Sequence, residues 1–277
     1  MTAPLIPQEI YLLERYTSLE YYAQMHDAWE AMLKHVEGLL DRFMRNLPAD
    51  YRKRTQPNQP DIVWGQLVLP NFRSTMQSLY DGYIRLSHGD YSALDGSRVS
   101  NDFRGQLEFW SGWMDEVEPN ASEKYGNLLC KTALFASNVK FSVGAYWVKG
   151  ALTTRFNASS RGALNPPPAW PRYRLNPSVQ VRTDELVLQT GIYLPDIDDS
   201  NAQFLIASRH YTKYVRNAPL ASVGYDPQTT QNVSEAPALW TLVERVPGET
   251  VPLEDGLGIP PAALHVYAGE PCPRAGF

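Results

Sequence analysis

The chain has 277 residues, of which 43 % are hydrophobic and 20 % are charged, so it can bury a sizeable core and is not expected to be disordered. Its net charge of −5 argues against the basic surface that nucleic-acid-binding proteins usually carry. We therefore expect a folded protein with no direct nucleic-acid binding.

The sequence shows no sign of export, membrane insertion or a metal site. The first residues, MTAPLIPQEIYLLERY, have no basic start, and Glu9 and Glu14 interrupt the apolar positions, unlike a signal peptide. The most apolar stretch, 127–148, contains Lys131, Asn138 and Lys140 and is too polar for a membrane span. Cys130 and Cys272 lie far apart and in no metal-ligand pattern. We expect a cytoplasmic protein without cofactor or metal.

Residues 1–160 predict an antiparallel helical bundle, with a short extra helix at 7–16. Thr17 and Glu20 have the spacing of a capping box and predict the start of a helix that runs to about residue 46. Its apolar face repeats at steps of three and four residues: Tyr22, Met25, Trp29, Met32, Val36, Leu40 and Phe43. The HGDYSALDG stretch at 88–96 predicts a break between helices.

Three further helices are expected in this region. The second has the face Leu69, Phe72, Met76, Leu79, Tyr83 and Leu86, with Pro70 in its first turn. The third has the face Val99, Phe103, Leu107, Trp110, Met114 and Val117. The fourth covers about 121–150, with a less regular pattern.

Composition changes near residue 150, because most of the 22 prolines follow it. Proline ends helices and is excluded from central strands, so this part is expected to consist of short pieces and many turns. We expect a proline-rich connector at 161–177 and a smaller, irregular β-rich domain at 178–277, which makes the fold class α+β. The predicted strands are 183–195, 201–214, 238–246 and 262–269.

No catalytic motif with a known mechanism is present, and the five histidines are scattered. In PDIDDSN, at 195–201, Asp196, Asp198 and Ser200 alternate as in a calcium loop, but the sixth position is Asn201 and the twelfth is Ala207, where glycine and glutamate are required. An acidic turn between two strands is the better interpretation. Its carboxylates, Asp196, Asp198 and Asp199, are the first candidates for contact with a basic partner.

EFWSGWMDEVE, at 108–118, places Trp110 and Trp113 on one predicted helix, where large side chains usually belong to the core, although a binding groove is the alternative. The acidic end of this stretch supplies the second set of partner-binding candidates: Asp115, Glu116 and Glu118. Cys272 lies between two prolines, which favours a rigid extended backbone over a nucleophile. We expect no enzyme activity.

The last ten residues, AGEPCPRAGF, resemble a signature near the end of the bacterial polymorphic-toxin immunity proteins known as immunity protein 71 and immunity protein 72. Further stretches agree in order and spacing and cover most of residues 8–277: IYLLERYTSLEYY, GDYSALDG, QLEFWSGWM, LVLQTGIYLP, NAQFLIA, VGYDPQTTQN and ALWTLVERV. TGIYLP and EPCPR are the more specific of these motifs.

This resemblance implies a cytoplasmic protein that protects its own cell from a toxin delivered between bacteria, commonly by a contact-dependent system such as type VI secretion. Such proteins bind the toxin one to one and block its active site. The target is then expected in the cytosol, with a nuclease as the first candidate, because nuclease surfaces are often basic. The alternatives are an adaptor or chaperone that loads a secreted effector, and an enzyme that reverses toxin damage.

Overall fold

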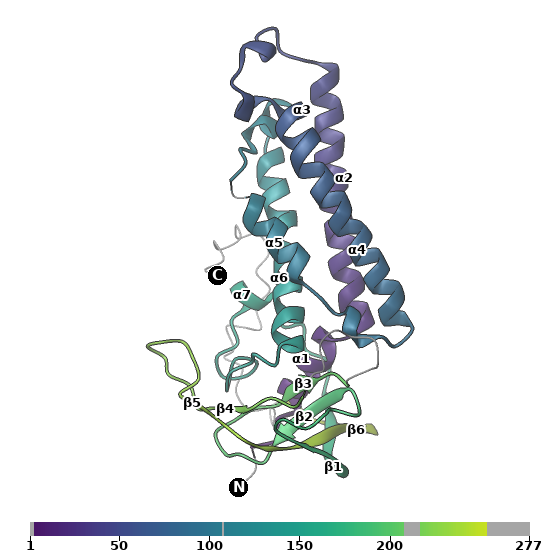
Figure 1. The fold of residues 1–277 in the computed structure, drawn as a ribbon, viewed down its shortest axis with the longest axis vertical. Coiled ribbons are helices and arrows are strands. Elements are labelled where there is room, and N and C mark those ends of the chain that lie inside the picture. The colour runs from purple at the N-terminus through teal and green to yellow at the C-terminus, as the bar shows by residue number, and fades with distance from the viewer. Residues whose placement is uncertain (1–2, 107, 208–216, 254–277) are drawn as a thin grey trace. The chain divides into compact units, whose positions relative to one another are not determined.

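The computed structural model describes residues 3–106, 108–207 and 217–253 (Figure 1). Helices and antiparallel strands both make up large parts of it, so the predicted α+β class is confirmed. The strand expected at 262–269 and the terminal decapeptide with Cys272 lie outside the described residues. Among the helices that the structure describes, none combines the length and the apolar character needed to cross a membrane.

The chain divides into two compact units. The first consists of residues up to Ser18 together with residues from Asn138 onward, and the second runs from Leu19 to Ser137. The expected boundaries, at 160 and 177, differ from this division. Residues 3–18 and 138–160, expected in the helical domain, belong to the same unit as the strands.

The second unit is built on helices α2 (Leu19–Arg45) and α4 (Leu69–Ser87), which lie side by side (Figure 1). Helix α5 (Ser97–Gln106) packs on α4, and α6 (Ala121–Val143) begins in this unit. The apolar faces predicted for α2 and α4 supply most of their buried side chains, with Trp29 and Phe72 in edge-to-face contact. At one end of the unit an aromatic cluster is joined by edge-to-face contacts: Phe43, Tyr51, Trp64, Trp113 and Tyr125.

The helix that contains α4 begins earlier than predicted. Helix α3 (Pro60–Ile62) continues through a π-helical stretch, Val63–Val68, directly into α4. In this stretch the Leu69 amide donates to the Trp64 carbonyl, five residues back. Pro70, which has no N–H to donate, follows this stretch in the first turn of α4.

The third predicted helix is wrong beyond residue 106. Helix α5 ends at Gln106, and a 3₁₀ turn, Gly112–Glu116, follows it. Trp113 is fully buried, whereas Trp110 is 46 % exposed, so the two indoles do not share a helix face. A Cβ atom at Gly112 would lie only 2.4 Å from the Trp110 ring nitrogen, so the Trp110 ring packs over the glycine at which the 3₁₀ turn begins.

Thr17 does not form the predicted capping box. Its hydroxyl donates to the Leu13 carbonyl at 2.8 Å and so satisfies the end of helix α1 (Pro7–Tyr16), which matches the helix predicted at 7–16. Because α2 begins at Leu19, Thr17 lies one residue too early to be its N-cap.

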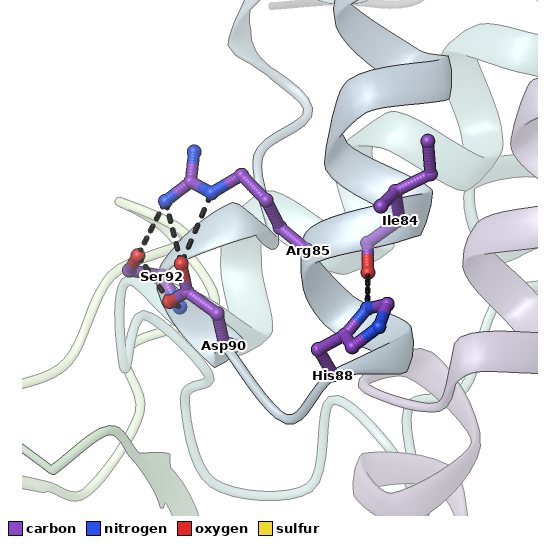
Figure 2. Close-up of polar contacts among 5 residues, drawn as sticks. All are labelled: Ile84, Arg85, His88, Asp90 and Ser92. Atoms are coloured by element: carbon purple, nitrogen blue, oxygen red, sulfur yellow. Dashed lines mark hydrogen bonds and ion pairs between the residues drawn. The ribbon is translucent and has the colours of Figure 1, made fainter.

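The break predicted at 88–96 is confirmed, and Figure 2 shows the contacts that fix it. The His88 ring nitrogen Nδ1 lies 2.7 Å from the Ile84 carbonyl, at the end of α4. Arg85 donates to Asp90 at 2.8 and 3.0 Å and to the Ser92 hydroxyl at 2.8 Å. These bonds close the turn before α5.

The first unit contains a four-stranded antiparallel sheet in the order β1-β6-β2-β3, formed by Trp170–Arg182, Leu239–Val251, Gly191–Pro195 and Gln203–Leu205. A separate pair joins β4 (Ala221–Val223) to β5 (Ser234–Ala236). The short helix α7 (Ala158–Arg161) precedes the sheet. One buried cluster connects the sheet with the segments around it: Val181, Val187, Tyr193, Leu205, Ala218, Ala221, Ala238, Trp240 and Leu242.

The expectation of short strands fails for β1 and β6, which have 13 residues each. Their three prolines lie at or beside irregularities in the pairing. Pro177 lies between Asn176 and Gln180, Pro171 borders the other shift, and Pro247 lies opposite that shift beside Gly248, whose φ is +74°. Proline is tolerated at such bulges and on edge strands because no ladder hydrogen bond needs its missing N–H. Since β1 begins at residue 170, half of the expected connector is part of the sheet.

Helix α1 packs on β1 and β2 of the same unit. The carboxylate of Glu14 accepts hydrogen bonds from the Tyr173 hydroxyl at 2.7 Å and from Arg245 at 2.5 Å. Burial and the Glu14 carboxylate both raise the pKa of Tyr173, so this hydroxyl stays a donor. Glu14 therefore connects α1 to β1 and β6, the two longest strands.

We expect Glu14 and Tyr173 to be energetically coupled. In a double-mutant cycle with Glu14→Ala and Tyr173→Phe, measured by urea unfolding, the coupling energy should be about 1–2 kcal/mol, because the bond is charge-assisted and half-buried. The exposed pair Arg172 and Glu249, on the same two strands, is the control and should show about 0–1 kcal/mol. Equal coupling in the two cycles would contradict a special role for Glu14.

Candidate functional site

The first acidic candidates lie on the connection between β2 and β3, in the first unit. Asp196 is held against the start of β6, because its carboxylate accepts from the Leu239 amide at 2.8 Å and its own amide donates to the Leu239 carbonyl at 3.0 Å. The Asp198 side chain is exposed, and its one hydrogen bond within the described chain comes from the Asp199 amide, at 3.1 Å in the same turn. These two carboxylates face solvent from a fixed backbone.

Asp199 has a different role from its neighbours. Its φ of +62° is unusual for a residue with a side chain, and its carboxylate forms an ion pair with Lys149. Its carbonyl accepts from the Gly224 amide at 2.8 Å. Gly224 has φ +68°, a conformation that favours glycine. Asp199 is therefore bound into the unit and its charge is compensated.

The second acidic candidates, in the other compact unit, already have partners. Asp115 accepts from the hydroxyl and the amide of Ser122, at 2.5 and 3.0 Å, and these bonds lower its pKa. Glu116 forms a two-point ion pair with Arg54 at 2.9 and 3.0 Å. Glu118 pairs with Arg42 at 2.7 Å. These carboxylates stabilise local structure and present less uncompensated charge than Asp196 and Asp198.

Next to the acidic turn, the first unit contains a cavity of about 320 Å³, named here the Arg155 cavity. Its walls come from the N-terminal segment with α1, the loop after α6, the turn after β2 and the segment after β4. The lining residues are Pro4, Ile6, Glu9, Lys149, Gly150, Thr153, Thr154, Arg155, Asp199, Ser200, Asn201 and Tyr225. Asp199 is thus shared by the acidic turn and the cavity.

Glu9 is a buried carboxyl in the wall of this cavity, with an exposure of 2 %. Burial raises the pKa of Glu9 to about 8, although hydrogen bonds from the Ala202 amide and the Asn201 side chain act in the opposite direction. The Ala202 amide lies 3.4 Å from Glu9 Oε2. At neutral pH Glu9 is therefore mainly protonated, and adds no charge to the cavity.

Arg155 is the cation of the cavity that has no carboxylate partner among the described residues. Its guanidinium lies over the ring of Tyr225, with 3.2 Å between the guanidinium carbon and the ring centroid. It also folds against Gly150, where φ is +77° and a Cβ atom would lie 3.3 Å from Arg155 Nε. A cation that is held by stacking keeps its hydrogen-bond donors for another group.

Three buried polar atoms of the cavity residues have no hydrogen-bond partner within the described chain: Arg155 Nη2, Ser200 Oγ and Asn201 Oδ1. An unsatisfied buried polar group costs about 1–3 kcal/mol. Such groups are rare in native proteins and usually indicate bound water, an ion or a functional site. All three residues line this one cavity, which makes it the candidate site for a small molecule.

The sequence alone could not have identified this cavity. Its residues come from four separate segments, and neither Glu9 nor Arg155 lies in a recognisable motif. The one local signal was that Glu9 interrupts the apolar positions of α1. Among the described residues, no group of three or more histidine, cysteine, aspartate or glutamate side chains could hold a metal ion.

Comparisons with protein-family models, with curated proteins and with solved structures found no match to this chain.

We expect Glu9 to make the stability of the protein depend on pH. Because the pKa of Glu9 is raised from 4.5 to about 8 on folding, its contribution is fully present below about pH 4.5 and is lost as the pH rises through about 8. Urea unfolding at about pH 5 and about pH 8 should show a larger loss of stability in the wild type than in Glu9→Gln, which cannot ionise.

The exposed Glu235→Gln substitution is the matched control and should follow the wild type. If Glu9→Gln and the wild type lose stability in parallel over this range, Glu9 is not the titrating group.

Proposed function

We propose that this protein is an immunity protein that binds a cognate antibacterial toxin in the cytosol and neutralises it by covering its active surface. The observation that carries this proposal is the acidic turn after β2, where Asp196 and Asp198 stand exposed on a backbone fixed by hydrogen bonds. The resemblance of AGEPCPRAGF and TGIYLP to immunity-protein motifs supports the same class of function.

A fixed backbone matters because ordering a loop on binding costs free energy. The two bonds between Asp196 and Leu239 attach the turn to β6, and the Gly224 amide holds the carbonyl of Asp199. The carboxylates of Asp196 and Asp198 are thus presented in one arrangement before any partner arrives. Such a surface favours a rigid, complementary partner.

The charge of this surface points to the chemistry of the partner. Exposed carboxylates raise the association rate with a basic surface, and the effect weakens with salt. The overall charge of −5 acts in the same direction. A toxin that acts on nucleic acid carries such a basic surface, so a nuclease is the proposed target class.

The two sets of acidic candidates should contribute unequally. Glu116 and Glu118 would have to leave Arg54 and Arg42 before they could pair with a partner. Asp199 would have to leave Lys149. The proposal therefore rests on Asp196 and Asp198.

The first experiment is to express the tagged chain from its native locus and to identify the protein that co-purifies with it at one-to-one stoichiometry. We expect a toxin domain that is lethal when it is expressed without this chain. Recovery of the chain alone would remove the support for a binding function.

With that partner in hand, Asp196→Asn with Asp198→Lys should lower the association rate about tenfold at low salt and much less at high salt. Asparagine keeps the acceptor that holds the Leu239 amide, so the turn should stay folded. The control is Asp184→Asn with Glu185→Lys, which changes the charge of the same unit equally at another exposed turn. Equal association rates of the two variants, measured by stopped-flow fluorescence, would contradict a role for the acidic turn.

A further inference from the structure

We propose that the Arg155 cavity is a binding site for a small carboxylate-bearing molecule, whose carboxylate pairs with the Arg155 guanidinium. This site goes beyond toxin binding and does not depend on it, because the cavity lies within the first compact unit and its ligand can be tested without a protein partner.

The size of the cavity limits the ligand. A volume of about 320 Å³ is at the lower end of the range for small-molecule sites. The ligand is therefore a small metabolite or the end group of a larger molecule. The cavity walls are formed by side chains from four segments, so its shape depends on the folded unit rather than on one loop.

The charges of the lining residues favour a ligand that carries one negative charge. Lys149 and Asp199 neutralise each other, and Glu9 is mainly protonated at neutral pH. Arg155 then leaves one positive charge without a carboxylate partner among the described residues. A planar guanidinium fits a carboxylate with two parallel hydrogen bonds.

Two further residues that line the cavity, Ser200 and Asn201, carry polar atoms without a partner in the described chain. Ser200 and Asn201 are each 3 % exposed, and Ser200 Oγ and Asn201 Oδ1 have no partner within the described chain. Asn201 Nδ2 donates to the Ala202 carbonyl at 3.1 Å, which fixes its Oδ1 as the atom that must accept. A hydroxyl or amino group next to the carboxylate would satisfy it, as in a small hydroxy acid.

A carboxylate fits this site better than a phosphate. A phosphate monoester carries nearly two negative charges at neutral pH, and the cavity offers one uncompensated positive charge. The second charge would lie near the carboxylate of Asp199 in a partly buried place, where repulsion is screened little.

The test uses the full chain and three probes at equal ionic strength and neutral pH: sodium glycolate, inorganic phosphate and sodium chloride. Thermal unfolding should shift upward with glycolate concentration, relative to chloride, while phosphate gives a smaller shift. Isothermal titration calorimetry should show one site for glycolate on each chain.

Three variants separate the proposed site from a general salt effect. Arg155→Gln should weaken glycolate binding by about tenfold or more, because the charged partner is lost. Arg174→Gln, an exposed arginine of the same unit, should bind as the wild type does. Ser200→Ala removes a hydroxyl without a protein partner, so it should fold normally and bind glycolate more weakly.

Absence of a glycolate-dependent shift in the wild type would overturn the proposal. So would an equal shift with phosphate, or glycolate binding that survives both Arg155→Gln and Ser200→Ala. None of these outcomes involves the toxin, so failure of this site leaves the proposed immunity function untouched, and failure of that function leaves the site untouched.

Discussion

The first compact unit depends on helix α1, which comes first in the chain and packs against strands that come more than 150 residues later. Three polar contacts fix it: Gln8 to the Leu152 carbonyl at 2.7 Å, Glu9 to the Ala202 amide at 3.4 Å, and Glu14 to Tyr173 at 2.7 Å. Closing so long a loop costs conformational entropy. The contacts of α1 offset that cost, so the unit is complete only when both ends of the described chain have come together.

Helix α1 also contributes to the wall of the Arg155 cavity, through Glu9. Glu9 is buried there, where its charge is unfavourable. The protein keeps Glu9 there in its protonated form rather than replacing it by an apolar residue, which would pack at lower cost. A buried carboxyl of this kind, in the same cavity wall as an arginine without a carboxylate partner in the described chain, is typical of sites that bind or transform a ligand.

Sequence reasoning succeeded where the determining contacts are local. The faces of α2 and α4 repeat within one helix, and the turn at 88–96 is fixed by neighbours such as Arg85 and Asp90. It failed where the local structure depends on contacts with residues far away in the sequence. Strand β1 contains two prolines and becomes a long strand only because β6 pairs with it around two bulges. Trp110 lies beyond the end of α5 at Gln106, and its carbonyl accepts from the distant Trp64 ring nitrogen at 3.1 Å. The cavity could not be predicted from the sequence for the same reason, since Arg155 contacts Tyr225 only in the folded chain.

Asp199 belongs to both the acidic turn and the cavity. Substitutions that are meant to separate the two functions must therefore be made at other residues. Asp199 binds Lys149 in the cavity wall, and its carbonyl accepts from the Gly224 amide, so removing its carboxylate would disturb both surfaces at once. Asp198 is exposed on the turn and does not line the cavity, whereas Arg155 lines the cavity and is not part of the turn. If substitution of Asp198 lowers partner binding and substitution of Arg155 does not, the partner binds the surface of the acidic turn. The reverse pattern would mean that an occupied cavity shapes the turn.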